Sequence, residues 1–393
     1  METIKIKLSE VIDDIAAGPF GSNLKVSCFV DYGFPIIDGA NLKEYKVTDN
    51  ITKFVTEEKA RSLHRSIAKR GDIVVTISGT LGQIAYIPND SKFKEYLCSQ
   101  RQFRVTFNSE KVYPPYLVFY FHTWEGQHKI LAFANQTGVP ALSQPLKNFK
   151  NIIIELPNIE VQKKIASFCE MLNDKIEQNN KINKNLQSQA LAIYIHMIVK
   201  KADESWHTGL LSDIASITMG QSPKGDSYNE NGIGTVFFQG RAEFSFRFPS
   251  RRLYTTEPKR MAKTNDILMS VRAPVGDLNV AYEDCCIGRG LSAIHSKDNH
   301  QSFVLYTMFV LRQQLDVFNG EGTVFGSINR DALNSIPISI PPHKVMDKFE
   351  SIVAPMDAII RINYEENCRL QAMRDSLLPR LMSGELDISA LNI

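Results

Sequence analysis

The chain repeats itself over almost its whole length, and this repeat limits what it can fold into. Three pairs of identical residues are each separated by 184 positions: Pro157 and Pro341, Asn179 and Asn363, Gln187 and Gln371. Upstream the matches continue with other offsets, as insertions in loops would produce: 69–85 with 263–281, and Cys98-x-x-Arg101 with Cys286-x-x-Arg289. Repetition over so long a period predicts two copies of one folding unit, over about residues 1–200 and 208–390.

In each copy, the sequence pattern changes once, from strand-like to helical. Its first part carries short β-branched and aromatic runs, such as 73–77 and 235–238, bounded by Gly, Pro, Asn and Asp, which is typical of short strands. A strand-like stretch then ends in proline, and a helical pattern follows. We therefore expect an α+β fold of two similar domains with twisted β-sheets and two long helices. The predicted boundaries are 1–157 for the first domain, 158–203 for the first helix, 204–341 for the second domain and 342–393 for the second helix.

Both helical segments carry a seven-residue repeat. The repeat positions, which we expect to form the helix seam, are Ile165, Leu172, Asn179, Leu186 and Ile193, then Phe349, Met356, Asn363, Leu370 and Leu377. The alternate seam is predicted at Val161, Phe168 and Ile182, then at Val345, Ile352, Ile359 and Met373. Sustained heptads predict that the two helices pack on each other as a coiled coil. The alternative is that each helix packs on its own domain.

Three residues within the helical segments carry further predictions. An interior proline removes a hydrogen bond and costs about 3 kcal/mol, so we expect the second helix to bend or restart at Pro355. Asn179 and Asn363 occupy the same seam position in the two copies. A buried polar residue at such a position fixes the register of a coiled coil while lowering its stability. The alternative is an asparagine tolerated at a helix edge.

Motifs of catalysis and metal binding are missing from the sequence. No phosphate-binding P-loop, H-E-x-x-H motif or nucleophile elbow occurs, and the six cysteines lack zinc-site spacing. The run 113–116, Tyr-Pro-Pro-Tyr, lacks the Asn, Asp or Ser that begins the Pro-Pro motif of amino-methyltransferases, so we interpret it as a turn. We expect no catalytic residue and no metal site.

The absence of a signal peptide and of a ~20-residue apolar run favours a soluble, cytoplasmic protein.

Polar recognition is the chemistry that remains. The net charge of +2 does not indicate nucleic acid, so that prediction depends on local clusters. Between Arg241 and Arg272, eight basic residues stand against three acidic ones, interleaved with phenylalanines. Basic groups neutralise phosphates, and Arg, Gln and Asn read base edges; the alternative is a solvated basic face. The residues predicted to contact DNA are Asn23, Lys25, Gln100, Arg101 and Gln102, then Gln221, Lys224, Arg241, Arg272 and Arg289.

The order of the motifs, twice over, resembles the specificity subunit of type I restriction–modification systems, and the resemblance covers essentially the whole chain. The matching segments are MGQSP (219–223), DILMSVRAPVGD (266–277), IGRGL (287–291), GDIV (71–74), GTLG (79–82), the helix start over 156–165 and the ending over 377–386. One departure is His343, which stands where Gln is expected at the start of the second helix, and Pro355 is another.

This resemblance implies a non-catalytic, sequence-specific DNA-binding subunit. Each domain would be a target-recognition domain that reads one half of a split site in double-stranded DNA. The two helices would form an antiparallel coiled coil that acts as a ruler, with a pseudo-twofold relation between the domains. The chain would direct two methyltransferase subunits, and optionally restriction subunits. It would bind no cofactor itself, because S-adenosylmethionine, ATP and Mg²⁺ belong to those partners.

Two other functions stay open at this point. One is a stand-alone DNA-modifying enzyme with an unrecognised site, for which turnover with DNA, Mg²⁺ and S-adenosylmethionine would be diagnostic. The other is a coiled-coil scaffold whose domains bind protein, which would not bind duplex DNA.

Overall fold

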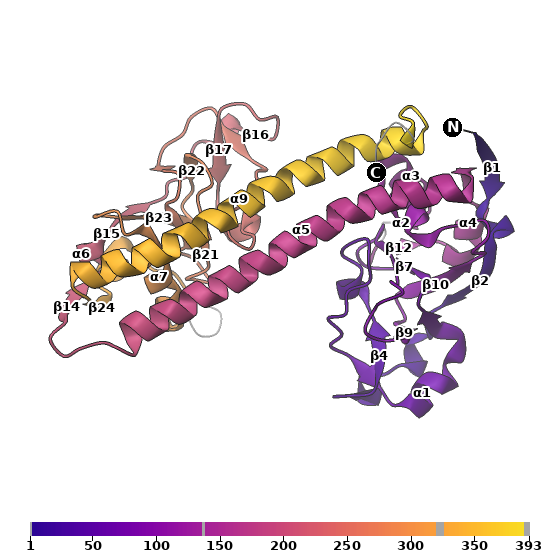
Figure 1. Ribbon diagram of the computed structural model, residues 1–393, viewed down its shortest axis with the longest axis horizontal. Helices are drawn as coiled ribbons and strands as arrows, with labels where there is room; N and C mark the ends of the chain where they lie inside the picture. Colours follow the sequence, from indigo (N-terminus) through magenta and orange to yellow (C-terminus); the bar gives the residue numbers. More distant parts are fainter. Residues whose placement is uncertain (1, 136–137, 320–325, 389–393) are drawn as a thin grey trace. The chain divides into compact units, whose positions relative to one another are not determined.

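The computed structural model describes residues 2–135, 138–319 and 326–388, which form two compact units. The first unit contains residues 1–177 and 366–393, and the second contains residues 178–365. Two long helices, α5 (Ile159–Tyr194) and α9 (His343–Met382), each contribute one end to the first unit and the other end to the second. They can be followed in Figure 1 as the long magenta and yellow-orange ribbons.

The first unit is built on two sheets of short strands. One is antiparallel with the order β2-β10-β7-β8, formed by Ile12–Ala17, Gln102–Phe107, Ile73–Thr76 and Ile84–Tyr86. The other is mixed with the order β3-β5-β4-β9-β6, formed by Phe29–Val30, Phe54–Val55, Phe34–Ile37, Glu95–Cys98 and Ile67–Lys69. Two strand pairs complete it: β1 (Thr3–Lys7) with β13 (Ile153–Pro157), and β11 (Ala134–Asn135) with β12 (Ala141–Leu142). Its short helices are α1 (Glu57–Ser62), α2 (Pro114–His122), α3 (Trp124–Leu131) and α4 (Pro145–Asn151).

The second unit repeats this strand order. Its antiparallel sheet, β15-β23-β20-β21, is formed by Ala215–Met219, Leu291–Ser296, Ile267–Ser270 and Leu278–Val280. Its mixed sheet, β16-β18-β17-β22-β19, is formed by Tyr228–Asn229, Tyr254–Thr255, Thr235–Phe238, Cys285–Ile287 and Met261–Ala262. The strand pair is β14 (His207–Leu210) with β24 (Pro337–Ile340), and the short helices are α6 (Leu211–Ile214), α7 (Gln301–Leu315) and α8 (Arg330–Asn334). The prediction of an α+β fold with two similar domains is confirmed, while the pseudo-twofold relation between them stays a prediction.

The central strand of each antiparallel sheet separates two cores. Because successive side chains of a strand point to opposite faces, Ile73 and Val75 of β7 enter the main core of the first unit, whereas Val74 enters a smaller one. In β20, Ile267 and Leu268 divide between two cores in the same way. The apolar runs that predicted these strands are therefore buried on both faces.

The long helices bury the predicted seam. All ten seam residues are buried or half-buried, Ile165 and Phe349 completely. The alternate seam was partly right. Phe168 is buried, and Val161 and Val345 are half-buried and pack against the cores. The other four predicted residues, Ile182, Ile352, Ile359 and Met373, are exposed, and the residue after each of them is buried or half-buried. A heptad seam alternates steps of three and four residues, and taking the step of three where the helix uses four selects a residue on the flank.

Within each unit the two helical segments run antiparallel and contact each other. In the first unit, Arg374 Nη1 donates to Asn173 Oδ1 at 2.7 Å, and Lys175 Nζ lies 3.5 Å from Glu366 Oε2. In the second unit, Asn363 Nδ2 donates to Asn183 Oδ1 at 2.8 Å. Helix residues also enter the domain cores, so packing on the partner helix and packing on the domain occur together.

Two details of the prediction for the second helix need correction. α9 does not restart at Pro355 but runs through it as a single helix, while the alternative, a bend at Pro355, stays a prediction. Pro355 is exposed, so the carbonyl that it leaves without an intrahelical partner lies on the side of the helix that faces water. The predicted replacement of Gln by His343 is also misplaced, because the offset of 184 pairs the buried Gln162 with Met346.

Among the described residues, no helix combines the length and apolarity needed to cross a membrane.

Gln162 shows why a glutamine stands at the start of the first helix. Its Oε1 accepts a hydrogen bond from the backbone of Tyr113 at 2.9 Å. Its Nε2 donates to the carbonyls of Lys111 and Pro157 at 2.9 and 2.8 Å. One fully buried side chain thereby ties α5 to the loop before α2 and to the end of β13. In the second unit Met346 fills this place with apolar packing instead.

Candidate functional site

Four loops meet at one end of the sheets in the first unit. We call them the first loop cluster, and they are 18–25, 38–41, 77–82 and 99–101. Backbone hydrogen bonds join them to one another and to the strand ends: Gly18 N to Gln102 O at 2.8 Å, Ile77 N to Arg101 O at 2.6 Å, and Ser99 N to Ile37 O at 2.9 Å. The loops therefore present one continuous surface held by the sheet backbone.

The second unit carries the same arrangement. Its second loop cluster consists of 220–224, 239–243, 271–276 and 288–290. The equivalent hydrogen bonds are Gly220 N to Leu291 O at 2.9 Å, Val271 N to Gly290 O at 3.0 Å, and Gly288 N to Phe238 O at 2.8 Å. The same end of the two sheets is therefore the loop-bearing end in both units.

In each cluster, one glycine is required because the backbone of a neighbouring loop lies very close to its Cα. A Cβ on Gly18 would lie 1.8 Å from the carbonyl oxygen of Ser99, and a Cβ on Gly220 would lie 2.2 Å from that of Gly288. Both clashes are with backbone, which cannot move aside as a side chain can. A glycine directly after the first strand of the sheet thus lets the first and last loops of each cluster pack together.

The predicted DNA-contact residues collect on these loops. Nine of the ten are exposed and lie in the two clusters: Asn23, Lys25, Gln100, Arg101, Gln221, Lys224, Arg241, Arg272 and Arg289. Gln102 is the exception, because it begins β10, is only 1% exposed, and accepts a hydrogen bond from the Ser99 hydroxyl through its side chain. Gln102 supports the loop rather than facing solvent, and we exclude it from the candidate surface.

The strand pairing also corrects the alignment of the two copies. Cys98 pairs with the end of β4, and it is Ile287, not Cys286, that pairs with the end of β17. Counting from these positions, Gln100 is equivalent to Arg289. Lys25 and Lys224 are equivalent as well, since each is the residue before a short 3₁₀ turn, Val26–Cys28 or Gly225–Ser227. Two pairs of residues chosen separately in the sequence thus occupy matching positions.

Several cations of these loops are unpaired, whereas most arginines of the basic stretch 241–272 are paired with carboxylates. In the described residues, the side chains of Lys25, Arg101, Lys224, Arg272 and Arg289 make no ion pair or hydrogen bond with protein. Such cations are available to phosphates or bases.

Most arginines of the stretch 241–272 are held by carboxylates instead. The pairs are Arg241 with Asp277, Arg247 with Asp357 at 3.0 Å, Arg251 with Glu283 at 2.5 Å, and Arg252 with Glu243 at 2.5 Å. The hydrogen bond to Glu243 raises the pKa of Arg252 above its usual range. Four of the eight basic residues of this stretch are therefore paired within the unit. Among the described residues, the other four are exposed and make no side-chain ion pair: Lys259, Arg260, Lys263 and Arg272. DNA contact by this stretch stays a prediction. Arg241 stays in the candidate set, since it is exposed and shares Asp277 with Arg312.

One exposed aromatic residue was missed. Phe20 lies in loop 18–25 beside the turn that carries Asn23, and it is 82% exposed. The run Gly-Pro-Phe-Gly, an aromatic residue enclosed by turn formers, was the sequence signal that could have identified it.

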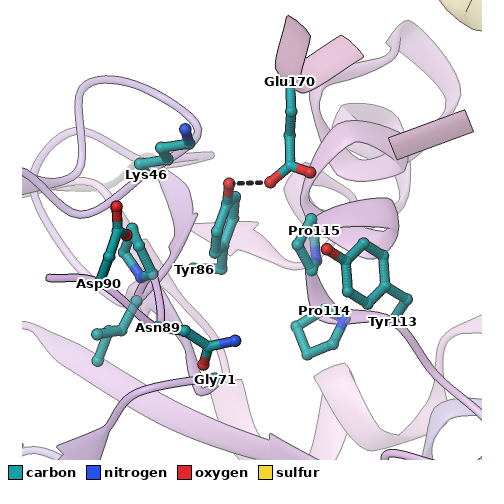
Figure 2. A pocket seen from close by; sticks show the side chains of 11 residues that line it. Lys46, Gly71, Tyr86, Asn89, Asp90, Tyr113, Pro114, Pro115 and Glu170 are labelled. Carbon is teal, nitrogen blue, oxygen red and sulfur yellow. Dashed lines mark hydrogen bonds between the residues drawn. The ribbon is translucent and has the colours of Figure 1, made fainter. Parts of the chain in front are cut away.

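Two buried cysteine thiols are poor nucleophiles. Burial raises the pKa of the Cys98 and Cys169 thiols to about 12, so both stay protonated near neutrality. A hollow of about 160 Å³ lies beside α2. Figure 2 shows three of the side chains that line it, Tyr86, Tyr113 and Glu170. The Tyr86 hydroxyl donates to the Glu170 carboxylate, and burial together with this bond raises the pKa of Tyr86.

The Pro-Pro run also lines this hollow, but its role is structural. Pro114 is the first residue of α2, where a proline fits because no intrahelical N–H is needed there. The run 113–116 was interpreted as a turn, but residues 114–116 form the start of α2, so that interpretation is corrected.

Comparison with known proteins gives a consistent result. The family model described as "type I restriction modification DNA specificity domain" matches the chain twice, over residues 21–188 and 203–372. The putative type I restriction enzyme MjaX specificity subunit of Methanocaldococcus jannaschii is 28% identical over 379 residues, which are 91% of this chain and 88% of that protein. The MjaIX specificity subunit of the same organism is 22% identical and covers 98% of this chain, with 94% of its own length matched. Among solved structures, the S subunit of a type I restriction–modification system from M. genitalium has a similar fold, with a TM-score of 0.61 at 15% identity and 97% and 96% coverage.

Proposed function

The chain belongs to the family of type I restriction–modification specificity subunits, and on this basis we propose that its two loop clusters are the two DNA-reading surfaces, each for one half of a split site. A member of this family is the DNA-recognition subunit and not a catalytic one. The function therefore lies in which bases the loops contact.

The observation that carries the proposal is the equivalence of the two loop clusters. Nine predicted residues lie on loops at the same end of the two sheets in both units. A surface of exposed Arg, Lys, Gln and Asn on a rigid strand frame suits duplex DNA, because phosphates need cations and base edges need bidentate polar groups. A protein-binding scaffold would not require unpaired cations at matching positions.

The chemistry of the equivalent pairs suggests separate roles. Lys25 and Lys224 are point charges that can neutralise phosphates and set the position of each unit on DNA. Gln100 and Arg289 can form bidentate hydrogen bonds, glutamine with adenine and arginine with guanine. Because one position carries a different base-reading residue in each unit, the two half-sites would differ. Phe20 adds an apolar group that can contact a thymine methyl or a sugar.

The partners complete the function. We propose that the chain joins two methyltransferase subunits, and restriction subunits where present, and directs them to its split site. The family suggests no cofactor on this chain, so S-adenosylmethionine, ATP and Mg²⁺ would be used by those partners. A cytoplasmic location follows from the proposal, since cellular DNA is the target.

The test is selection of bound sites from a pool of random duplexes, using the chain assembled with its methyltransferase subunits. We expect two short motifs at a fixed spacing, separated by a spacer in which no base is preferred. Arg289→Ala should relax one position of one motif and weaken binding by about 1–3 kcal/mol. Lys297→Ala is the matched control, because Lys297 is a cation at the opposite end of β23.

A single uninterrupted motif, or equal effects of the two variants, would refute the proposal. Absence of duplex binding would favour the scaffold. Methyl transfer or cleavage by the chain alone would favour the stand-alone enzyme.

A further inference from the structure

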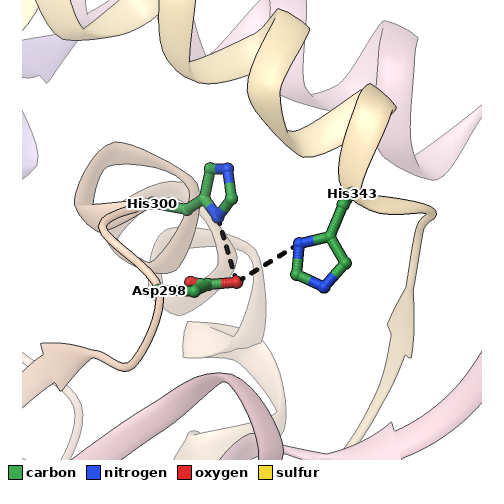
Figure 3. Close-up of side chains that lie close together, drawn as sticks. All are labelled: Asp298, His300 and His343. Carbon is green, nitrogen blue, oxygen red and sulfur yellow. Dashed lines mark ion pairs between the residues drawn. The ribbon is translucent and has the colours of Figure 1, made fainter.

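We propose that Asp298, His300 and His343 form a binding site for one divalent transition-metal ion, with Zn²⁺ as the expected occupant. Asp298 follows β23, His300 precedes α7, and His343 is the first residue of α9 (Figure 3). One candidate ligand atom from each side chain lies within 4.8 Å of the others. The DNA-reading function uses none of these residues, and the sequence did not predict the site because His343 is remote from the other two.

The distances suit a shared ion. Asp298 Oδ2 lies 3.0 Å from His300 Nδ1 and 3.7 Å from His343 Nδ1. Ligands bound at about 2.0–2.1 Å to one tetrahedral ion are about 3.3 Å apart, which falls between these two values. In Figure 3 both imidazole rings direct Nδ1 toward the same carboxylate oxygen. One ion between the three side chains could therefore be reached by small rotations.

The buried imidazole of His300 is the second observation that points to a ligand. Its side chain is only 8% exposed, and among the described residues its Nδ1 has no hydrogen-bond partner of acceptable geometry. Asp298 Oδ2 lies 3.0 Å from this nitrogen as an ion-pair contact, in a geometry that is poor for a hydrogen bond. A bound ion between the two groups would give each a partner of good geometry.

The other ring nitrogen of His300 is already oriented. Nε2 lies 2.9 Å from Asp347 Oδ1, which is the arrangement in which a carboxylate holds the N–H of a metal-binding histidine. This contact leaves Nδ1 free to carry the lone pair that binds metal. Two imidazoles and one carboxylate favour Zn²⁺ over Mg²⁺ or Ca²⁺, which prefer oxygen ligands. Three protein ligands leave a fourth position for water.

The site would be structural. It joins α9 to the loop before α7, and Glu350 of α9 already accepts hydrogen bonds from the backbones of Ser302 and Phe303, both at 3.0 Å. An ion would add a second tie at the same junction, near the first turn of α9. We expect it to stabilise that turn without taking part in DNA contact.

Protonation opposes metal binding at this site. A proton and a metal ion compete for the same Nδ1, because only neutral imidazole is a ligand. Affinity for the ion should therefore be higher at pH 8 than at pH 6.

The experiment uses the full chain without a histidine tag, stripped with a chelator and titrated separately with Zn²⁺ by calorimetry and with Co²⁺ by absorption. We expect one equivalent of each and visible Co²⁺ bands typical of four-coordinate N and O ligands. His343→Ala and His343→Gln should abolish this binding. Asp347→Asn should weaken it about 10- to 100-fold. His207→Ala, which removes an exposed histidine of the same unit, should leave it unchanged.

Three results would overturn the proposal. The first is no stoichiometric binding by the wild-type chain. The second is equal binding by the wild-type chain and both His343 variants. The third is a thiolate charge-transfer band with Co²⁺, which would place the ion on cysteine instead. Circular dichroism of each variant shows whether lost binding reflects lost folding, and the exposed position of His343 makes its variants compatible with the fold.

Discussion

Lengthening both long helices by four residues should widen the spacer of the DNA site. The insertions belong where each helix passes between the units, after residue 177 in α5 and after residue 365 in α9. Both must be changed, because the helices pair within each unit, through Arg374 and Asn173 in the first and Asn363 and Asn183 in the second. An insertion in α5 alone would bring one set of contacts out of register.

The size of the effect follows from helix geometry. Four residues add about 6 Å at ~1.5 Å per residue and rotate the seam about 40° beyond a full turn, so the apolar stripe nearly regains its face. DNA rises ~3.4 Å per base pair, so the spacer should grow by one or two base pairs. Two residues instead rotate the seam by about 200°, which should destabilise the helix pair.

The assay is mapping of methylated bases in cells that carry each variant with the partner subunits. The four-residue variant should methylate the same two half-sites at the longer spacing, because no loop of either cluster is altered. The two-residue variant should lose methylation. A folded, active four-residue variant with an unchanged spacer would show that the helices do not set the distance.

Three single substitutions test other parts of the account. Lys224→Ala should weaken binding to all DNA sequences equally and reduce the slope of log affinity against log salt by about 1, measured by fluorescence anisotropy. Gln162→Ala leaves the backbone N–H of Tyr113 without its partner and should lower the free energy of unfolding by about 1–3 kcal/mol, measured in urea. Asp357→Ala leaves the buried guanidinium of Arg247 without its carboxylate and should lower it by about 3–5 kcal/mol.

A matched control separates these effects from general damage. Gln189→Ala changes an exposed residue of α5 and should shift the urea midpoint little. If Gln162→Ala or Asp357→Ala behaves like this control, the buried contact does not stabilise the unit. If Lys224→Ala alters the preferred sequence and leaves the salt slope unchanged, this lysine is not a phosphate contact.

The repeat and the helix seam could be predicted because each follows from the type and spacing of the residues along the chain. Identical spacing in two copies requires the same fold twice, and residues such as Ile165 and Phe349 are apolar because they are buried. The alternate seam was only partly right, because Ile182 and Ile359 are apolar although exposed. Which flank of a helix is covered depends on the elements that pack on it, and those are remote in sequence.

For the candidate site too, local features could be predicted from the sequence and tertiary contacts could not. The loops could be located because strand ends and turn residues are local signals, and nine of ten chosen side chains are exposed on them. Gln102 looked equivalent to its exposed neighbours, but strand alternation turns it inward. The pairing of arginines in the basic stretch could not be predicted, because partners such as Asp357 and Glu283 lie far along the chain. Ion pairs of this kind depend on tertiary structure.

The central claim is that each unit reads its own half of the site through equivalent loops. The most direct measurement is methylation mapping in cells that carry either Gln100→Ala or Arg289→Ala. We predict that each variant relaxes one position in a different half-site, and that the other half-site and the spacer stay unchanged. If both variants alter the same half-site, or if neither alters any position while the protein stays folded and active, the claim is contradicted.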